Sequence, residues 1–154
     1  MTQLEEQKIT GVSVARMDMK LEVVVIPVSD VDRAKNFYGR LGWRLDADFR
    51  FENGFRVAQF TPPGSGTYLQ FGTKVTPVAP GSAESHYLVV SDIAAAHDQL
   101  VAHGVDVSGV FHQGAPDAHF QPEGSNGRLS GPSPDHTSYR SYATFSDPDG
   151  NLWL

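Results

Sequence analysis

The sequence predicts an α+β fold built from two copies of one βαβββ unit. The first observation is a repeat, in which "VSDVDRAKNFYGRLGW" from Val28 is matched by "VSDIAAAHDQLVAHGV" from Val90. The second is that each copy follows a run of β-branched residues and precedes several further strand candidates. A repeat of this length indicates one supersecondary unit used twice. One unit alone has a single helix for its sheet, so the second copy is expected to cover the face that the helix leaves open.

The first unit is expected over residues 19–76. The run "LEVVVIPV" barely alternates between apolar and polar residues, which predicts a strand buried on both faces. Ser29 and Asp30 follow it and can cap a helix, and Gly42 stands where a left-handed C-cap belongs. Three strand candidates complete the unit: "WRLDADFRF", "FRVAQFTP" and "TYLQFGTKV". The predicted inner face of the helix consists of Val31, Ala34, Phe37, Tyr38 and Leu41.

A linker over residues 77–84 leads to the second unit, residues 85–154. Its opening strand is "HYLVV", and the predicted helix face consists of Ile93, Ala96 and Leu100, with His103 as an optional fourth member. The later strand candidates are "VDVSGVFHQ", "SYATFS" and "NLWL", the last of them after the turn "DPDG". Between them, residues 113–138 are too long and too rich in Gly, Pro and Ser for a hairpin loop. Loops of this kind are often lids or binding loops.

Composition excludes several classes of protein. The 154 residues, 40% of them hydrophobic, suffice for one domain with a core. The net charge of −6 argues against nucleic-acid binding, and the absence of cysteine excludes disulfides and thiolate metal ligands. The chain shows neither a membrane-spanning apolar run nor a secretory signal, so a cytoplasmic protein is expected. Residues 1–18 are expected to be a flexible extension, with "GVSVARM" as an extra edge strand the alternative.

Three stretches in this order resemble the vicinal oxygen chelate superfamily, the glyoxalase, bleomycin-resistance and extradiol-dioxygenase group. They are "VVVIPVSDVDRAKNFYGRLGW", "HYLVVSDIAAAHDQLVAHG" and "FSDPDGNLWL", and the resemblance covers residues 20–154. It implies two βαβββ modules whose curled mixed sheet surrounds a central cavity, and commonly a homodimer. In many members, four side chains hold a divalent metal in that cavity, two from each module. Relatives also continue for several residues beyond the last strand seen here.

The four metal-ligand positions of the family carry over to Val23, Gln70, Ser85 and Leu154. Two of these side chains are aliphatic, one is an amide and one a hydroxyl. Divalent transition metals need histidine or carboxylate ligands that converge from several strands. The resemblance therefore predicts a member without the family metal and without another cofactor.

A cavity without a metal is expected to be a mostly apolar small-molecule pocket. Strand alternation and the aromatic content predict which residues line it, and plain core packing is the alternative for each of them. The predicted ligand-binding residues are Val23, Val25, Trp43, Phe49, Phe60, Tyr68, Gln70, Ser85, Tyr87, Phe111, Tyr142 and Leu154.

Histidines gather in and beside the long loop, at positions 112, 119 and 136. A histidine titrates near neutral pH and can act as a general acid or base. His112, at the end of a predicted strand, is the preferred catalytic candidate. The alternatives are a metal site outside the family positions and ordinary solvated loop polarity.

Four functions follow from these patterns. The leading one is a bleomycin-resistance-like protein that binds a small apolar or aromatic molecule without transforming it. The first rival is a metal-independent enzyme of the same fold that uses a loop histidine. A metal-dependent lyase, isomerase or dioxygenase is the next rival, and the residues at the four metal-ligand positions argue against it. A protein-interaction module has no positive feature in its favour.

Overall fold

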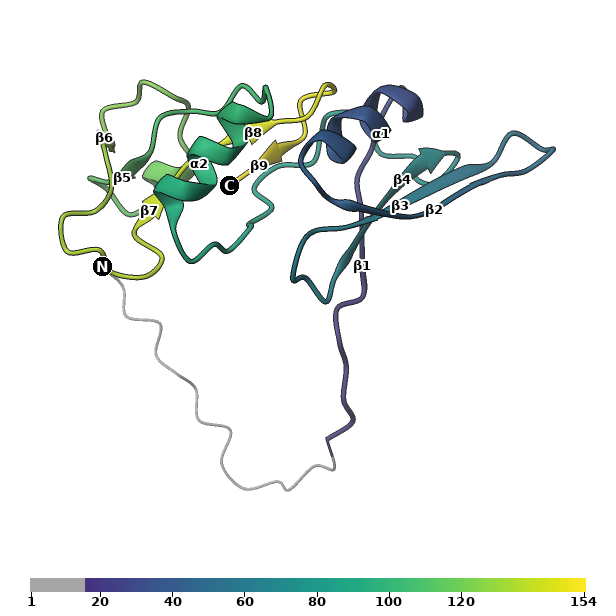
Figure 1. The fold of residues 1–154 in the computed structure, drawn as a ribbon, viewed down its shortest axis with the longest axis horizontal. Coiled ribbons are helices and arrows are strands. Elements are labelled where there is room, and N and C mark those ends of the chain that lie inside the picture. The colour runs from purple at the N-terminus through teal and green to yellow at the C-terminus, as the bar shows by residue number, and fades with distance from the viewer. Residues whose placement is uncertain (1–15) are drawn as a thin grey trace.

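The computed structural model describes residues 16–154, so most of the predicted N-terminal extension, residues 1–18, lies outside the described part. Figure 1 shows two halves side by side, each with one helix and its own strands. The predicted α+β fold with two helices and curled, unclosed sheets is confirmed. Neither helix within residues 16–154 has the length and apolar character that a membrane span requires.

The first half forms a four-stranded sheet in the order β1-β4-β3-β2. β1 runs parallel to β4, and the other neighbours are antiparallel. A register shift between Leu45 and Ala47 leaves Asp46 at a bulge in β2. The elements are β1 (Val23–Val25), α1 (Val31–Arg40), β2 (Arg44–Arg50), β3 (Arg56–Thr61) and β4 (Tyr68–Thr73).

Helix α1 begins and ends as its sequence predicts. The Asp30 carboxylate accepts a hydrogen bond of 3.0 Å from the backbone N–H of Arg33, which caps the first turn. Gly42 follows the helix with a φ of 81°, a conformation that glycine adopts without steric cost. The whole predicted inner face is buried: Val31, Ala34, Phe37, Tyr38 and Leu41.

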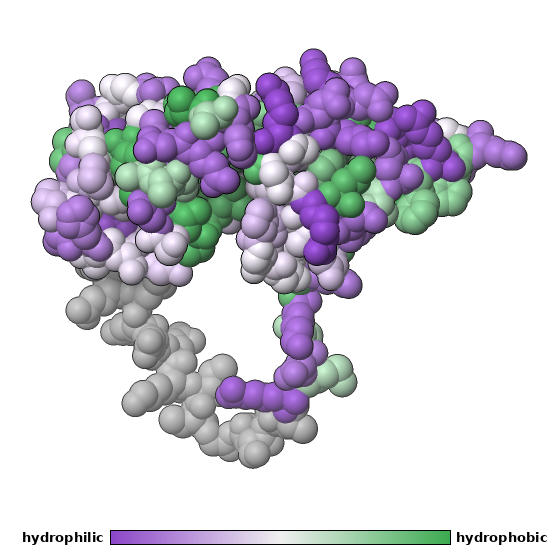
Figure 2. Space-filling view, in the orientation of Figure 1, coloured by the Kyte–Doolittle hydropathy of each residue, from purple (hydrophilic) through white to green (hydrophobic). Residues whose placement is uncertain are grey.

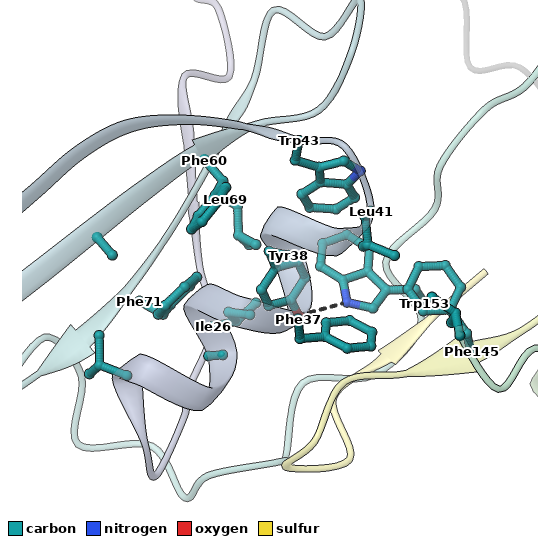
Figure 3. Close-up of a cluster of buried hydrophobic side chains, with 14 residues drawn as sticks. Ile26, Phe37, Tyr38, Leu41, Trp43, Phe60, Leu69, Phe71, Phe145 and Trp153 are labelled. Atoms are coloured by element: carbon teal, nitrogen blue, oxygen red, sulfur yellow. Dashed lines mark hydrogen bonds between the residues drawn. The ribbon is translucent and has the colours of Figure 1, made fainter. Parts of the chain in front are cut away.

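Tyr38 lies at the centre of the core and joins the two halves (Figure 3). Its ring centroid is 5.5 Å from that of Phe71 in β4 and 5.2 Å from that of Trp43. Its hydroxyl donates to the Asp147 carboxylate at 2.8 Å and accepts from the indole N–H of Trp153 at 3.0 Å. Asp147 and Trp153 belong to the second half, so burial and hydrogen bonding around one residue hold both halves together.

The second half follows the strand order of the first with shorter strands, and β6 is an additional strand beside β5. Its sheets are β6-β5-β7 and β8-β9, and a bridge between Val107 and Phe145 links the two hairpins. His86 bridges in parallel to Trp153 and so takes the place that β1 has beside β4. The elements are α2 (Ile93–Ala102), β5 (Phe111–Gln113), the 3₁₀-helix η1 (Ala118–Phe120), β6 (Arg128–Ser130), β7 (Ser141–Tyr142), β8 (Phe145–Ser146) and β9 (Leu152–Trp153).

Helix α2 is capped like α1 but is not buried like it. The Asp92 carboxylate accepts from the backbone N–H of Ala95 at 3.0 Å, and Gly104 has a φ of 76°. No residue of α2 is buried, although its predicted face has the same spacing as that of α1. The sheet under α2 is less complete, so the helix has less apolar surface to cover.

Two further expectations differ from the structure. β1 is not fully buried on either face, because Val23 and Val24 are half-buried and Val25 is 41% exposed on the side of the sheet away from α1. Residues 113–138 are not a structureless loop, since they contain η1 and β6. Strand pairing between β5 and β6 supplies hydrogen bonds to this long connection and holds it against the second half.

Candidate ligand-binding site

The sheet of the first half has one face without a helix, called the first open face here. Val23 pairs with Tyr68 and Val25 pairs with Gln70, so these four side chains share that face. Phe49 joins them from β2 and is 59% exposed. Five of the predicted ligand-binding residues are therefore brought together on one half-exposed, mostly apolar surface.

Polar groups also stand on the first open face. The Gln70 amide donates to the Gln59 carbonyl oxygen at 2.8 Å. Asp46 accepts from the hydroxyl of Thr61 and from Nε of Arg44, the latter at 2.7 Å. The hydrogen bond from Thr61 lowers the pKa of the Asp46 carboxyl, and that from Arg44 adds to the effect. The face thus carries one firmly ionised carboxylate that already has partners.

The second half gathers aromatic rings into an aromatic cluster, defined by Tyr87, Phe111, His119 and Tyr142. The Phe111 and Tyr142 rings stack at 5.7 Å, and His119 stacks on Tyr142 at 5.0 Å with 9° between the planes. The Tyr87 ring lies 6.1 Å from that of His119. The Arg128 guanidinium stands over the Phe111 ring at 4.1 Å, a cation–π distance.

Local structure explains how residues distant in sequence meet in the aromatic cluster. Phe111 and Tyr142 lie directly opposite each other in the β5–β7 pair, so their side chains share one face. Arg128 follows in β6 and donates from Nε to the backbone carbonyl of Ala118 at 3.2 Å. Ala118 is fully buried, which fixes η1 on the sheet and carries the neighbouring His119 onto Tyr142.

Titration in the aromatic cluster is governed by burial. Burial lowers the pKa of His119 and is the largest effect. The nearby Asp117 carboxylate raises this pKa, and the Arg128 guanidinium lowers it. Its Nδ1 contacts the side-chain amide of Gln113. Burial also raises the pKa of the Tyr142 hydroxyl. At neutral pH, the cluster therefore presents an uncharged imidazole and an uncharged phenol.

A hollow of about 900 Å³ opens beside the aromatic cluster and ends at the first residues of α2. Tyr87, Tyr142 and Leu154, all predicted ligand-binding residues, border it. A second crevice of about 450 Å³ lies between the halves, where Trp43 and Tyr87 both contribute. Figure 2 shows apolar surface on both halves along the line where they meet. Both volumes are in the range of small-molecule sites.

Three predicted site residues lie elsewhere. Ser85 borders neither the hollow nor the crevice. Phe60 is 1% exposed and packs in the core beneath α1, because its position in β3 points away from the first open face. His112 pairs with Ser141 and therefore points away from the face that carries Phe111. Its Nδ1 lies 2.8 Å from the carbonyl oxygen of Gly131. The histidine that reaches the cluster is His119, and only the fold of the loop reveals it.

The residues at the four metal positions of the family do not suit a divalent transition metal. Val23 and Leu154 offer only hydrocarbon, and the Gln70 amide is bonded to Gln59. Ser85 offers a neutral hydroxyl from a residue with a φ of 62°. Within residues 16–154, no group of three or more His, Asp or Glu side chains is placed to hold a metal ion.

Comparison with models of known families gives one match. A profile described as "Glyoxalase/Bleomycin resistance protein/Dioxygenase superfamily" matches residues 20–154. No protein of curated function matches the sequence.

Solved structures with a similar fold cover most of the chain. TnmS3, described as an antibiotic binding protein from Streptomyces sp. CB03234, is 28% identical, with a TM-score of 0.63 over 90% of this chain and 95% of its own. A glyoxalase/bleomycin resistance protein from the same organism is 29% identical, with a TM-score of 0.60 over 87% and 96%. A superfamily member from Sphaerobacter thermophilus is 22% identical, with a TM-score of 0.62 over 90% and 96%, and shows the fold alone.

Proposed function

Because the chain belongs to the glyoxalase/bleomycin resistance protein/dioxygenase superfamily, we propose that it binds a small apolar or aromatic molecule at the aromatic cluster without the family metal. The observation that carries this proposal is the convergence of Tyr87, Phe111 and Tyr142, three predicted ligand-binding residues, with His119 on one face. Stacked rings bind flat apolar molecules through dispersion and burial of surface.

The surroundings of the cluster favour an aromatic ligand. Tyr87 is 51% exposed and borders both the hollow and the crevice between the halves, so a ligand can reach its ring. His119 lies in the long connection, so residues 113–138 can act as a lid that closes over a bound molecule. The antibiotic-binding description of TnmS3, a protein 28% identical over most of both chains, supports a ligand of this class.

The test is a binding screen read by mass spectrometry, with a panel of planar aromatic natural products and antibiotics as probes. For any compound bound, we expect Tyr142→Ala to weaken affinity about tenfold, since aromatic contacts contribute about 0.5–1.5 kcal/mol beyond buried area. Tyr142→Phe keeps the ring and should bind like the unaltered protein. Phe51→Ala removes an exposed aromatic ring of the first half and is the matched control.

Two outcomes would contradict the binding proposal. One is equal affinity of the unaltered protein and Tyr142→Ala for every bound compound. The other is a stoichiometric transition metal in the purified protein, measured by elemental analysis. A bound compound that is recovered chemically unchanged supports sequestration.

A metal-independent enzyme of the same fold is the second candidate, and the placement of His119 favours it. Its imidazole is neutral at pH 7 because burial lowers its pKa, so it can accept a proton from a ligand held on Tyr142. Turnover of a bound compound that His119→Gln abolishes would select this function over sequestration. Turnover that survives in His119→Gln would remove His119 from the mechanism.

We further propose a cytoplasmic homodimer, with a second copy covering the first open face. Val25 and Phe49 are 41% and 59% exposed there, an apolar surface that a partner would bury. Sedimentation velocity at micromolar concentration should show a species of twice the chain mass. A monomer at all concentrations would contradict the dimer.

A further inference from the structure

Arg128 differs from the other cations of low exposure in the described chain. Among the lysines and arginines of residues 16–154, only Lys35, Arg56 and Arg128 are half-buried or buried. Lys35 and Arg56 each pair with the Asp48 carboxylate, at 3.0 Å and 2.9 Å. Arg128 forms no ion pair with a carboxylate of the same described residues. A cation that is partly removed from water is costly without a counter-ion, so Arg128 is able to attract an anion.

The protein already uses part of the Arg128 guanidinium. Its Nε donates to the Ala118 carbonyl at 3.2 Å, and its Nη2 donates to the His119 carbonyl at 3.4 Å. One face of the group lies on the Phe111 ring, at 4.1 Å from the centroid. Nη1 has no hydrogen-bond partner in the described chain and lies at the surface. The group therefore keeps its positive charge and free N–H donors for an acceptor from solution.

His119 offers a second donor, because Gln113 determines which ring nitrogen carries the proton. The side-chain nitrogen of Gln113 donates to the Pro116 carbonyl at 3.1 Å, which fixes the orientation of the amide. The same nitrogen contacts Nδ1 of His119, so Nδ1 accepts a hydrogen bond. In the neutral imidazole, the proton then lies on Nε2. Nε2 has no partner among the described residues and lies at the surface, so it can donate to a ligand.

Strand register places these donors on the face that carries the aromatic cluster. Arg128 lies opposite Gln113 in the β5–β6 pair, so their side chains share a face. Phe111 precedes Gln113 by two residues on β5 and shares the same face. His119 stacks on Tyr142, which faces the same way as Phe111. The stacked rings and the two donors are therefore parts of one surface.

The acidic residues near this surface do not neutralise Arg128. The Asp117 carboxylate accepts from the Gln121 amide at 2.9 Å, and Glu123 is exposed. Burial lowers the pKa of Arg128, and the charge of Glu123 opposes this effect without forming an ion pair. Burial also has the largest effect on the pKa of His119, and Asp117 opposes it in the same way. Both carboxylates thus act only at a distance.

We propose that the ligand of the aromatic cluster is an aromatic acid, whose ring stacks on Tyr142 and whose carboxylate accepts hydrogen bonds from Arg128 and from Nε2 of His119. This inference rests on the proposed binding function and names the class of ligand. A carboxylate supplies the counter-ion that Arg128 lacks, and charge-assisted hydrogen bonds are stronger than neutral ones. The same tautomer weighs against the metal-independent enzyme, because the accessible nitrogen of His119 already carries a proton.

The test uses two matched probes, naphthoate and naphthamide. They share one ring system, and only naphthoate is charged at neutral pH. Isothermal titration calorimetry of the unaltered protein at low salt should show naphthoate binding about tenfold more tightly than naphthamide. Added salt should reduce this preference, because it screens the attraction between the carboxylate and Arg128.

Arg128→Gln removes the charge and keeps a side-chain amide that can donate toward the Ala118 carbonyl. The ratio of the two affinities is the readout, since a general loosening of the site weakens both probes alike. We expect the preference for naphthoate to disappear in Arg128→Gln. Arg40→Gln removes the same charge from an exposed position at the end of α1 and is the matched control, in which the preference should persist.

The tautomer of His119 has a readout of its own. Nitrogen NMR of the imidazole without ligand should show a protonated Nε2 and an unprotonated Nδ1. A neutral ring protonated at Nδ1 would contradict the role of His119 as a donor to the carboxylate.

Two results with the probes would overturn the aromatic acid and leave the binding function standing. One is equal affinity of the unaltered protein for naphthoate and naphthamide, and the other is a preference for naphthoate that survives in Arg128→Gln. If neither probe binds, the wider panel of compounds decides. A panel that yields only neutral ligands would contradict the aromatic acid, and a panel that yields no ligand would contradict the binding function, on which this inference rests.

Discussion

The two halves of the molecule carry the same repeated unit, yet only the helix of the first half is buried against its sheet. α1 buries four of its own residues, and α2 buries none. β4 has six residues and β9 has two. The helix caps are the same in both halves, so the difference lies in how each helix packs on its sheet.

The two halves also differ in their ion pairs. In the first half, Arg56 donates to Asp48 at 2.9 Å and Lys35 contacts Asp48 at 3.0 Å, which ties α1 to its sheet. At the offset of the repeat, Lys35 corresponds to His97 and Asp48 to Val110. The second half therefore has no counterpart to this ion-pair network among the repeated positions. A repeat in sequence thus specifies local structure without specifying equal stability.

The largest effect is expected where the helix faces are compared directly. Tyr38→Ala removes the centre of the core and should lower the free energy of unfolding by about 3–5 kcal/mol. Leu100→Ala, at the corresponding position of half-buried α2, should cost roughly 1 kcal/mol. Urea unfolding of both variants measures the difference. Equal losses would mean that α2 is as well packed as α1.

A smaller effect is expected at the hydrogen bonds that join the halves. Tyr38→Phe keeps the ring but leaves the buried Trp153 indole N–H without its partner. It also removes one hydrogen bond from the Asp147 carboxylate, which Asn151 continues to contact. The cost should be about 1–3 kcal/mol, because unpaired buried polar groups are expensive. Tyr68→Phe, on the first open face, is the control and should cost under ~0.5 kcal/mol in the same thermal unfolding assay.

The smallest effect is expected at the ion-pair network of the first half. The hydrogen bond from Arg56 holds the pKa of the Asp48 carboxyl well below its unfolded value near ~3.9. A lowered folded pKa adds stability above ~pH 4, and that stability is lost as pH falls through the folded pKa.

Asp48→Asn should therefore lower the free energy of unfolding at pH 7 by about 1 kcal/mol. The difference in the free energy of unfolding between Asp48→Asn and the unaltered protein should shrink as the pH falls below about 4. Urea unfolding from pH 7 to pH 2.5 checks both statements. A difference that stays constant over this range would exclude an ionised Asp48 as its cause.

Much of the fold could be predicted because local signals agree. Asp30 and Asp92 cap their helices as predicted, and Gly42 and Gly104 end them with positive φ. Less of the candidate site could be predicted from the sequence. Strand alternation places Val23, Val25, Tyr68 and Gln70 on one face, as the structure shows. Alternation cannot say which loop histidine reaches the aromatic cluster of the second half.

The choice between His112 and His119 shows the limit of prediction from the sequence. His112 follows the period of its strand and so points away from Phe111, a fact that depends on the register with β7. His119 reaches Tyr142 because Arg128 and the buried Ala118 hold η1 against the sheet. His119 and Tyr142 are far apart in the sequence, so no periodic pattern of residues predicts their contact.

The sequence by itself determined the repeat, the helix caps, the order of the strands and the absence of suitable groups at the metal positions of the family. Those properties depend on neighbours in the chain or on the chemistry of single side chains. Tertiary structure alone decided that Tyr38 joins the halves, that His119 enters the aromatic cluster and that no residue of α2 is buried. Each depends on which surfaces meet, because burial and hydrogen bonding are set by neighbours in space.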